Sequence, residues 1–164
     1  MICFDFSIFF NVILSEFIFK CAVGKNGIKL KKVEGDYTTP LGAFSLGKLY
    51  YRADRVNRPL TKIPCKIIKE NMGWCDDPKN KYYNKEILIN KNIRHEKLFR
   101  KDNSYDYLIT IEYNSKKIIP YKGSAIFIHL TKNYKSTAGC IALKEKDFLI
   151  IAKLITKKTR IKIS

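Results

Sequence analysis

The chain has 164 residues, of which 46% are hydrophobic and 13% aromatic. These values indicate one folded domain with its own core and exclude a disordered tail. The formal net charge is +17, from 32 Lys+Arg against 15 Asp+Glu. Such a charge is typical of proteins that work close to polyanions. The chain is also rich in Lys, Ile, Asn, Tyr and Phe, however, which is the composition that an AT-rich coding sequence favours. Because no ribonucleoprotein motif or zinc-finger spacing accompanies the charge, we expect no nucleic-acid partner.

The N-terminal stretch is strongly apolar, and we interpret it as β-structure. Asp5 and Glu16 interrupt it, no basic region precedes it, and its longest uncharged run, Phe6 to Ser15, is too short to span a bilayer. We therefore predict two strands, Ile2–Phe10 and Glu16–Val23, joined by a short turn, and no transmembrane segment. A degenerate export signal is the alternative.

Turn-forming residues organise the next part of the chain. Gly24–Gly27 contains Asn-Gly, which suits the positive φ angles of a tight hairpin turn, and Ile28–Lys32 is the expected return strand. The loop Glu34–Gly42 then leads to a strand near Ala43–Leu46. Residues 50–104 are polar, contain prolines and have little periodicity, so we expect a long, partly irregular excursion of the kind that forms lids or binding walls.

Regular patterns return in the last third of the chain. Residues alternate from Tyr107 to Tyr113, with Tyr107, Ile109, Ile111 and Tyr113 on one face of a predicted strand. Ser124–Leu130 is nearly all apolar, which is typical of a strand buried on both faces.

A helix and a final strand are predicted to close the domain. Lys144–Thr156 has helical spacing, with Phe148, Ile151, Leu154 and Ile155 in one apolar stripe. Lys157-Lys158 suits the C-terminus of this helix. Arg160–Ile163 is the expected edge strand.

A histidine and a cysteine carry the strongest chemical signal. His129 ends the apolar strand, and Cys140 follows Ala138-Gly139. Small residues before a nucleophile allow a tight turn and free backbone N–H groups to face a developing oxyanion. A thiol with a pKa of about 8.5 is mostly protonated at pH 7, so it needs a nearby imidazole to become a thiolate. The alternative is a core histidine and a small buried cysteine, because the pair by itself proves nothing.

Several segments in order resemble the L,D-transpeptidase catalytic domain, the YkuD-like family. They run from about residue 16 to residue 164, and the pieces are Gly24–Gly27, Lys32–Asp36, Thr39–Phe44, Gly73–Pro78, Tyr83-Asn84, His95–Leu98, Gly123–Phe127 and His129 with Ser136–Cys140. Ala138 stands where common members carry a second histidine, and Ile141-Ala142 follow the cysteine in place of polar residues. These departures bear on substrate preference and on the choice between transferase and hydrolase.

The resemblance implies a mainly β fold, a sandwich of mixed sheets with a helix after the nucleophile, in one catalytic domain over residues 1–164. It implies acyl transfer on peptidoglycan stem peptides through a thioester, with a donor tetrapeptide, an acceptor amine and a 3→3 cross-link. Cys140 would be the nucleophile, His129 the general base and acid, and Gly139 a backbone donor of the oxyanion hole. No metal or organic cofactor is implied, and the location would be the periplasm or cell envelope.

Two other functions remain open from the sequence. Water could resolve the same thioester, which would make the protein a wall hydrolase resembling an L,D-carboxypeptidase. A basic binding module for wall polyanion or nucleic acid, with Cys140 idle, is the alternative from another class. The sequence does not determine the oligomeric state.

Further residues are candidates for supporting roles. Trp74 and Asp76 could line the substrate groove, or Trp74 could anchor a structural loop. Ser136 and Thr137 could orient His129 or the bound peptide.

Acidic and histidine side chains elsewhere have two readings. Glu34 and Asp36 could be an acid–base pair, but turn capping is the favoured interpretation. His95 could be a second imidazole at the site or could brace a loop.

Cys65 and Cys75 could form a disulfide in an oxidising compartment.

Overall fold

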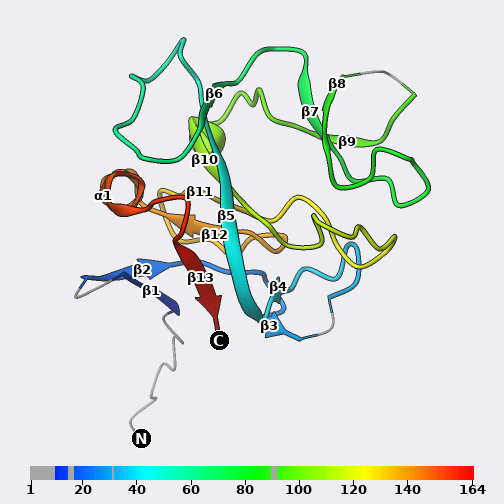
Figure 1. Cartoon of the computed structure of the whole chain (residues 1–164), viewed down its shortest axis with the longest axis horizontal. Coiled ribbons are helices and arrows are strands. Elements are labelled where there is room, and N and C mark those ends of the chain that lie inside the picture. Colours follow the sequence, from blue (N-terminus) through cyan, green and yellow to red (C-terminus); the bar gives the residue numbers. More distant parts are fainter. Residues whose placement is uncertain (1–9, 15–16, 31, 90–91) are drawn as a thin grey trace, which may run out of the picture.

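A computed structural model of the chain describes residues 10–14, 17–30, 32–89 and 92–164. Its centre is a six-stranded mixed sheet in the order β12-β11-β10-β5-β13, with β6 beside β5. Its strands are β5 (Gly42–Tyr51), β6 (Cys65–Ile67), β10 (Tyr107–Ile111), β11 (Phe127–Leu130), β12 (Ile141–Leu143) and β13 (Arg160–Ile163). β5 runs through the middle of the molecule (Figure 1).

Smaller sheets and, among the described residues, two helices surround this centre. A three-stranded antiparallel sheet has the order β8-β7-β9, and two-stranded sheets pair β1 with β2 and β3 with β4. The elements are β1 (Phe10–Leu14), β2 (Phe17–Cys21), β3 (Ile28–Lys29), β4 (Thr39–Pro40), β7 (Met72–Cys75), β8 (Glu86–Leu88), β9 (His95–Lys97), the 3-10 helix η1 (Asn103–Tyr105) and α1 (Glu145–Leu154). The fold is mainly β with mixed sheets and a helix after Cys140, which confirms the expected class.

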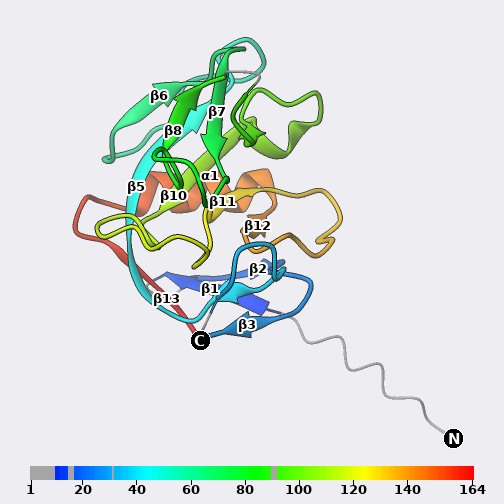
Figure 2. The ribbon, with the colours of Figure 1, turned by 90° about the vertical axis from the view of Figure 1, so that its right-hand side faces the viewer.

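The central sheet is buried on both faces, and each face has its own core. On β10, Ile109 and Ile111 contribute to the larger core, whereas Leu108, which precedes Ile109, faces the smaller one. This confirms the alternation predicted for Tyr107–Tyr113, although the strand ends at Ile111. Figure 2 shows the elements on either side of the central sheet: β7 and β8 lie above the central strands in this view, and α1 lies behind those strands.

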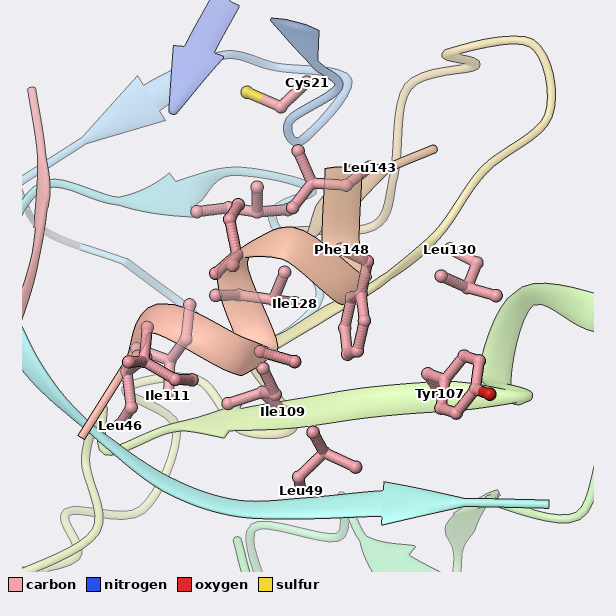
Figure 3. Packing of buried hydrophobic residues seen from close by; sticks show 14 of the residues in the cluster. Cys21, Leu46, Leu49, Tyr107, Ile109, Ile111, Ile128, Leu130, Leu143 and Phe148 are labelled. Carbon is pink, nitrogen blue, oxygen red and sulfur yellow. The ribbon is translucent and has the colours of Figure 1, made fainter. Parts of the chain in front are cut away.

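Helix α1 covers the larger core. Phe148 is fully buried and stacks on Tyr107 with 5.7 Å between ring centroids, and Figure 3 shows it pointing toward the strands below the helix. Burial of such a ring stabilises the fold by about 1.5–3 kcal/mol. The prediction for Leu154 is wrong, because it is 43% exposed and Ala152 takes the buried position. The helix ends at Leu154, so the two lysines predicted at its C-terminus lie beyond it.

A β-bulge bends β5 between the part that pairs with β13 and the part that pairs with β10. Ile109 pairs with Leu49, but Ile111 pairs with Leu46, so β5 carries one extra residue there. A Cβ at Gly47 would overlap the side chains of Glu112 and Thr110, so glycine suits the bulge. Bulges increase local twist, and here the bend lets β5 pair with β10 at one end and β13 at the other.

The N-terminal strands differ from the prediction in position. Residues 2–9 of the predicted first strand lie outside the described residues, and Phe10–Leu14, most of it predicted as a turn, is strand β1. A continuous apolar run has no period to mark where a strand begins. The second predicted strand is confirmed as β2, and Ala22, just after it, bridges to Ala142 of β12.

The turn at Gly24–Gly27 is confirmed, but its return strand is wrong. Gly27 has a φ of +78°, and its N–H donates to the Gly24 carbonyl at 2.8 Å. The strand after it is only Ile28–Lys29 and pairs in parallel with β4. The segment before the turn binds the loop of Cys140 instead, since the Thr137 N–H donates to the Val23 carbonyl at 2.9 Å.

The predicted excursion over residues 50–104 contains regular structure. β5 extends to Tyr51, and β6 to β9 and part of η1 follow within the segment. These strands have three or four residues each, too few for alternation to show in the sequence. The sheet β8-β7-β9 packs over the smaller core, directly beside Cys140.

Candidate active site

A cavity of about 740 Å³ opens beside β11 and the loop that leads into β12. Most of the residues singled out from the sequence line it: Cys140, His129, Gly139, Ser136, Thr137 and Asp76. Charged side chains from distant segments complete the wall: Lys32, Glu34, Arg94, Glu96, Arg100 and Asp102. The fold therefore gathers the predicted thiol and imidazole in one solvent-accessible site.

Strand register places Cys140 and His129 on the same face of the central sheet. β11 and β12 are parallel, with His129 opposite Ala142, and Cys140 lies two residues before Ala142. Side chains alternate along a strand, so Cys140 shares the face of His129. From the usual rise and strand spacing, the two Cα atoms are about 8 Å apart, which is within reach of rotating side chains.

His129 is held in the form that suits a base. Its Nδ1 lies 2.9 Å from the Leu130 carbonyl oxygen, which can only accept, so Nδ1 carries the proton and Nε2 has a free lone pair. The ring of Tyr105 packs edge-on against the imidazole, with 5.3 Å between centroids. Burial lowers the pKa of His129 below 6.5, so the ring is neutral at pH 7.

Cys140 rests as a neutral thiol. It is 7% exposed, its Sγ donates to the Ala125 carbonyl at 3.2 Å, and the Phe127 N–H donates to the sulfur at 3.3 Å. Burial raises the pKa of this thiol to about 12, and the Glu96 carboxylate adds to the effect. A neutral pair, and not a preformed thiolate–imidazolium pair, is therefore the resting state.

The turn before Cys140 is fixed from both sides. Gly139 has a φ of +146°, which favours glycine, and its N–H donates to Thr137 Oγ1 at 3.0 Å. The same hydroxyl donates to the Cys140 carbonyl at 2.6 Å, and Thr39 Oγ1 donates to the Gly139 carbonyl at 2.9 Å. Thr137 thus stabilises the turn before Cys140, whereas Ser136 is exposed at the rim.

The family model of the L,D-transpeptidase catalytic domain (YkuD) matches residues 13–163. The chain belongs to the L,D-transpeptidase catalytic domain family. No match was found among curated proteins or among solved structures.

In this transpeptidase domain Asp76 and Trp74 have different positions. Asp76 lines the cavity and forms an ion pair with Arg94 at 3.1 Å. Trp74 lies outside the cavity lining, where its ring packs edge-on against Phe127 at 5.2 Å. Its Nε1 donates to Asn84 Oδ1 at 2.9 Å, so it anchors Asn84, which bonds Ala125 in the cavity lining.

Asn84 is a structural centre that sequence reasoning did not single out. Its Oδ1 also accepts from the Ala125 N–H at 3.0 Å, and its Nδ2 donates to the carbonyls of Tyr113 and Asn114 at 3.0 and 2.8 Å. These bonds hold Ala125, the hydrogen-bond acceptor of the Cys140 thiol. The only sequence signal was its place in the Tyr83-Asn84 piece of the family resemblance.

Glu34 and Asp36 have separate roles in the transpeptidase domain. Asp36 accepts from the N–H groups of Val33 and Thr38 at 2.8 and 2.9 Å, which confirms turn capping. Glu34 does not cap a turn: its carboxylate accepts from the Tyr83 hydroxyl and from Ser124 Oγ, the latter at 2.8 Å. It ties the loop after β3 to the segment before β11.

Glu96, the neighbour of His95, is the residue of β9 that reaches the cavity. His95 Nδ1 bonds the Ile93 carbonyl at 2.6 Å, and the side chain lies outside the cavity lining. Glu96 accepts a hydrogen bond from the Tyr105 hydroxyl, and burial raises the pKa of its carboxyl. Tyr105 thereby connects Glu96 to the ring of His129.

Disulfides, metal clusters and membrane-spanning helices are absent among the described residues. Cys21, Cys65, Cys75 and Cys140 are free thiols, so the Cys65–Cys75 bridge left open by the sequence is not formed. Within the described ranges, no group of three or more His, Cys, Asp or Glu side chains could hold a metal ion. Over the same residues, no helix is long and apolar enough to cross a bilayer.

Proposed function

We propose that this protein is a cysteine-dependent L,D-transpeptidase that transfers acyl groups between peptidoglycan stem peptides. The observation that carries the proposal is the placement of Cys140 and His129 on one face of the sheet, at the wall of one cavity, in a chain of this family. The neutral His129, with Nε2 free to accept, supports the role of base.

The first half-reaction forms a thioester. The Cys140 thiol gives its proton to Nε2 of His129, and Sγ attacks the carbonyl carbon of the third residue of a donor tetrapeptide. The tetrahedral intermediate collapses, its C–N bond breaks, and His129 gives the proton to the departing amine of D-alanine. General acid–base catalysis of this kind contributes about 10²–10⁴-fold to the rate.

The second half-reaction resolves the thioester. The amine of a diamino acid on a neighbouring stem attacks the acyl carbon, its proton passes to His129, and Cys140 leaves as the thiol. The product is a 3→3 cross-link. No metal or organic cofactor takes part.

Backbone N–H groups of Gly139 and Cys140 are assigned to the oxyanion. Such donors typically contribute about 2.7–4 kcal/mol to transition-state stabilisation. The Gly139 N–H now donates to Thr137 Oγ1, so it reaches the oxyanion by exchanging that bond.

Because the substrate is part of the cell wall, we place the protein in the periplasm or cell envelope.

Purified protein and a disaccharide tetrapeptide test the proposal by product chromatography. Transpeptidation gives a cross-linked dimer with loss of D-alanine, and Cys140→Ala gives none. Free tripeptide without dimer assigns the protein instead to the hydrolytic alternative, in which water resolves the same thioester. Absence of both products with folded protein overturns the proposal.

A further inference from the structure

A buried lysine lies directly against the turn that carries the nucleophile. Lys32 is 3% exposed, and its side chain passes between two glycines of positive φ. A Cβ built on Gly123 would lie 2.8–3.0 Å from the Lys32 methylene carbons, and one built on Gly139 would lie 3.3 Å from its Nζ. The ammonium nitrogen therefore lies beside the residue that precedes Cys140.

The charge of Lys32 is only partly neutralised. An ammonium has three N–H donors, and within the described part of the chain one protein acceptor is found, Asp36 Oδ1 at 2.9 Å. That carboxylate also accepts from the N–H groups of Val33 and Thr38. Although burial opposes it, these bonds and Lys32 together lower the pKa of Asp36 to about 2.

A positive charge at this point favours a negative charge on the Cys140 sulfur. Of the groups that face the thiol, Glu96 disfavours a negative charge on the sulfur, whereas Lys32 and Arg100 favour it, and His129 and Tyr105 are neutral. Arg100 is drawn to Asp102 by an ion pair at 2.6 Å. Lys32 differs from Arg100 because it borders the glycine turn, where the oxyanion forms.

We infer that Lys32 is a catalytic residue, whose ammonium stabilises the negative charge that develops on Cys140 Sγ and on the oxyanion beside Gly139. The oxyanion part rests on the proposed acyl transfer, whereas the thiolate part does not. Preorganised charge at a site of low dielectric acts on developing charge without reorganisation. Asp36 holds the lysine in place and tempers its charge.

Opposite charge changes at Lys32 and Asp36 test whether Lys32 stabilises the Cys140 thiolate. The rate of Cys140 alkylation by iodoacetamide is followed at pH 7.5 by mass spectrometry of the tryptic peptide Ser136–Lys144, which contains no other cysteine. Lys32→Met removes the positive charge and should slow alkylation about tenfold. Asp36→Asn unmasks the lysine and should accelerate alkylation at least about threefold. Lys162→Met, an exposed lysine on β13, is the matched control and should leave the rate unchanged.

The direction of the two effects separates charge from structure. A structural role alone moves both variants the same way, and that result overturns the inference. The double variant Lys32→Met/Asp36→Asn should alkylate at a rate between those of the two single variants. Where circular dichroism shows Lys32→Met to be poorly folded, the double variant is compared with Asp36→Asn in its place.

Turnover of the disaccharide tetrapeptide tests the oxyanion part. Lys32→Met should lower kcat at least about tenfold while KM stays within about threefold, because the charge acts on the transition state. A rise in KM at unchanged kcat refutes this part. Should the wild-type protein form neither product, the proposed function fails, but opposite alkylation shifts still support Lys32 as the charge that activates the thiol.

Discussion

The carbonyl oxygen of Ala125 accepts the hydrogen bond of the Cys140 thiol, with 3.2 Å between oxygen and sulfur. Ala125 has a φ of +52°, in the left-handed region that residues other than glycine seldom adopt. Its N–H donates to Asn84 Oδ1, so this conformation aims the carbonyl at the sulfur. In the proposed mechanism the thiol proton leaves Ala125 for His129 before attack, so the segment before β11 would take part in catalysis.

Cys140→Ala should abolish formation of both dimer and tripeptide, because Cys140 is the only cysteine among the described residues that lines the cavity. The loss of one buried sulfur costs about 1 kcal/mol, so Tm should fall by only about 2–4 °C in a domain of this size. Product chromatography and thermal denaturation measure the two effects. Turnover retained by the variant would refute the assignment of the nucleophile.

His129→Gln should lower kcat/KM by at least about 10²-fold, the lower end of the cost of losing a general base. His95→Gln should change it less than about tenfold, or roughly 1.4 kcal/mol, because His95 lies outside the cavity lining. Steady-state kinetics on both folded variants at one pH makes the comparison. A larger loss for His95→Gln would contradict the choice of base.

Alkylation of Cys140 should keep rising with pH between about pH 7 and 10, close to tenfold per pH unit. The reason is that burial raises the pKa of this thiol to about 12, so the thiolate fraction grows throughout the range. Iodoacetamide rates read from the same tryptic peptide provide the measurement. A rate that levels off below pH 8 would show a preformed thiolate.

The acidic limb of kcat/KM should have its midpoint below pH 6.5. The base must be neutral, and burial lowers the pKa of His129, so the active form persists as pH falls past the ordinary value and is lost only lower. Initial rates between pH 5 and 8, with stability checked at each pH, define the limb. A midpoint above pH 7 would be inconsistent with this environment for His129.

Asn84→Ala should destabilise the domain by about 2–4 kcal/mol. The change removes both acceptor and donor atoms of a buried amide and leaves the Trp74 Nε1–H and the Ala125 N–H without their partner. Urea denaturation measures the loss. Asn71→Ala, at an exposed position, is the control and should stay within about 0.5 kcal/mol. Equal stability of both variants would argue against the role of Asn84.

Local patterns were enough for the elements that form around a clear period or turn. The alternation at Tyr107–Tyr113, the helix after Cys140 and the edge strand Arg160–Ile163 all follow from residues close in sequence. The Gly24–Gly27 turn follows from glycine and asparagine at positions of special φ. The pairing of His129 with Cys140 was proposed from the family motif, and the parallel register of β11 and β12 places both on one face.

Long-range contacts decided the rest, and no local period reports them. The burial of Lys32 between Gly123 and Gly139 requires that segments 91 and 107 residues away along the chain come together around it. Asn84 and Glu96 acquire their partners only when the sheet β8-β7-β9 packs over the smaller core. The sequence shows which residues these are. Their burial, charge state and roles arise from the tertiary packing that removes them from water.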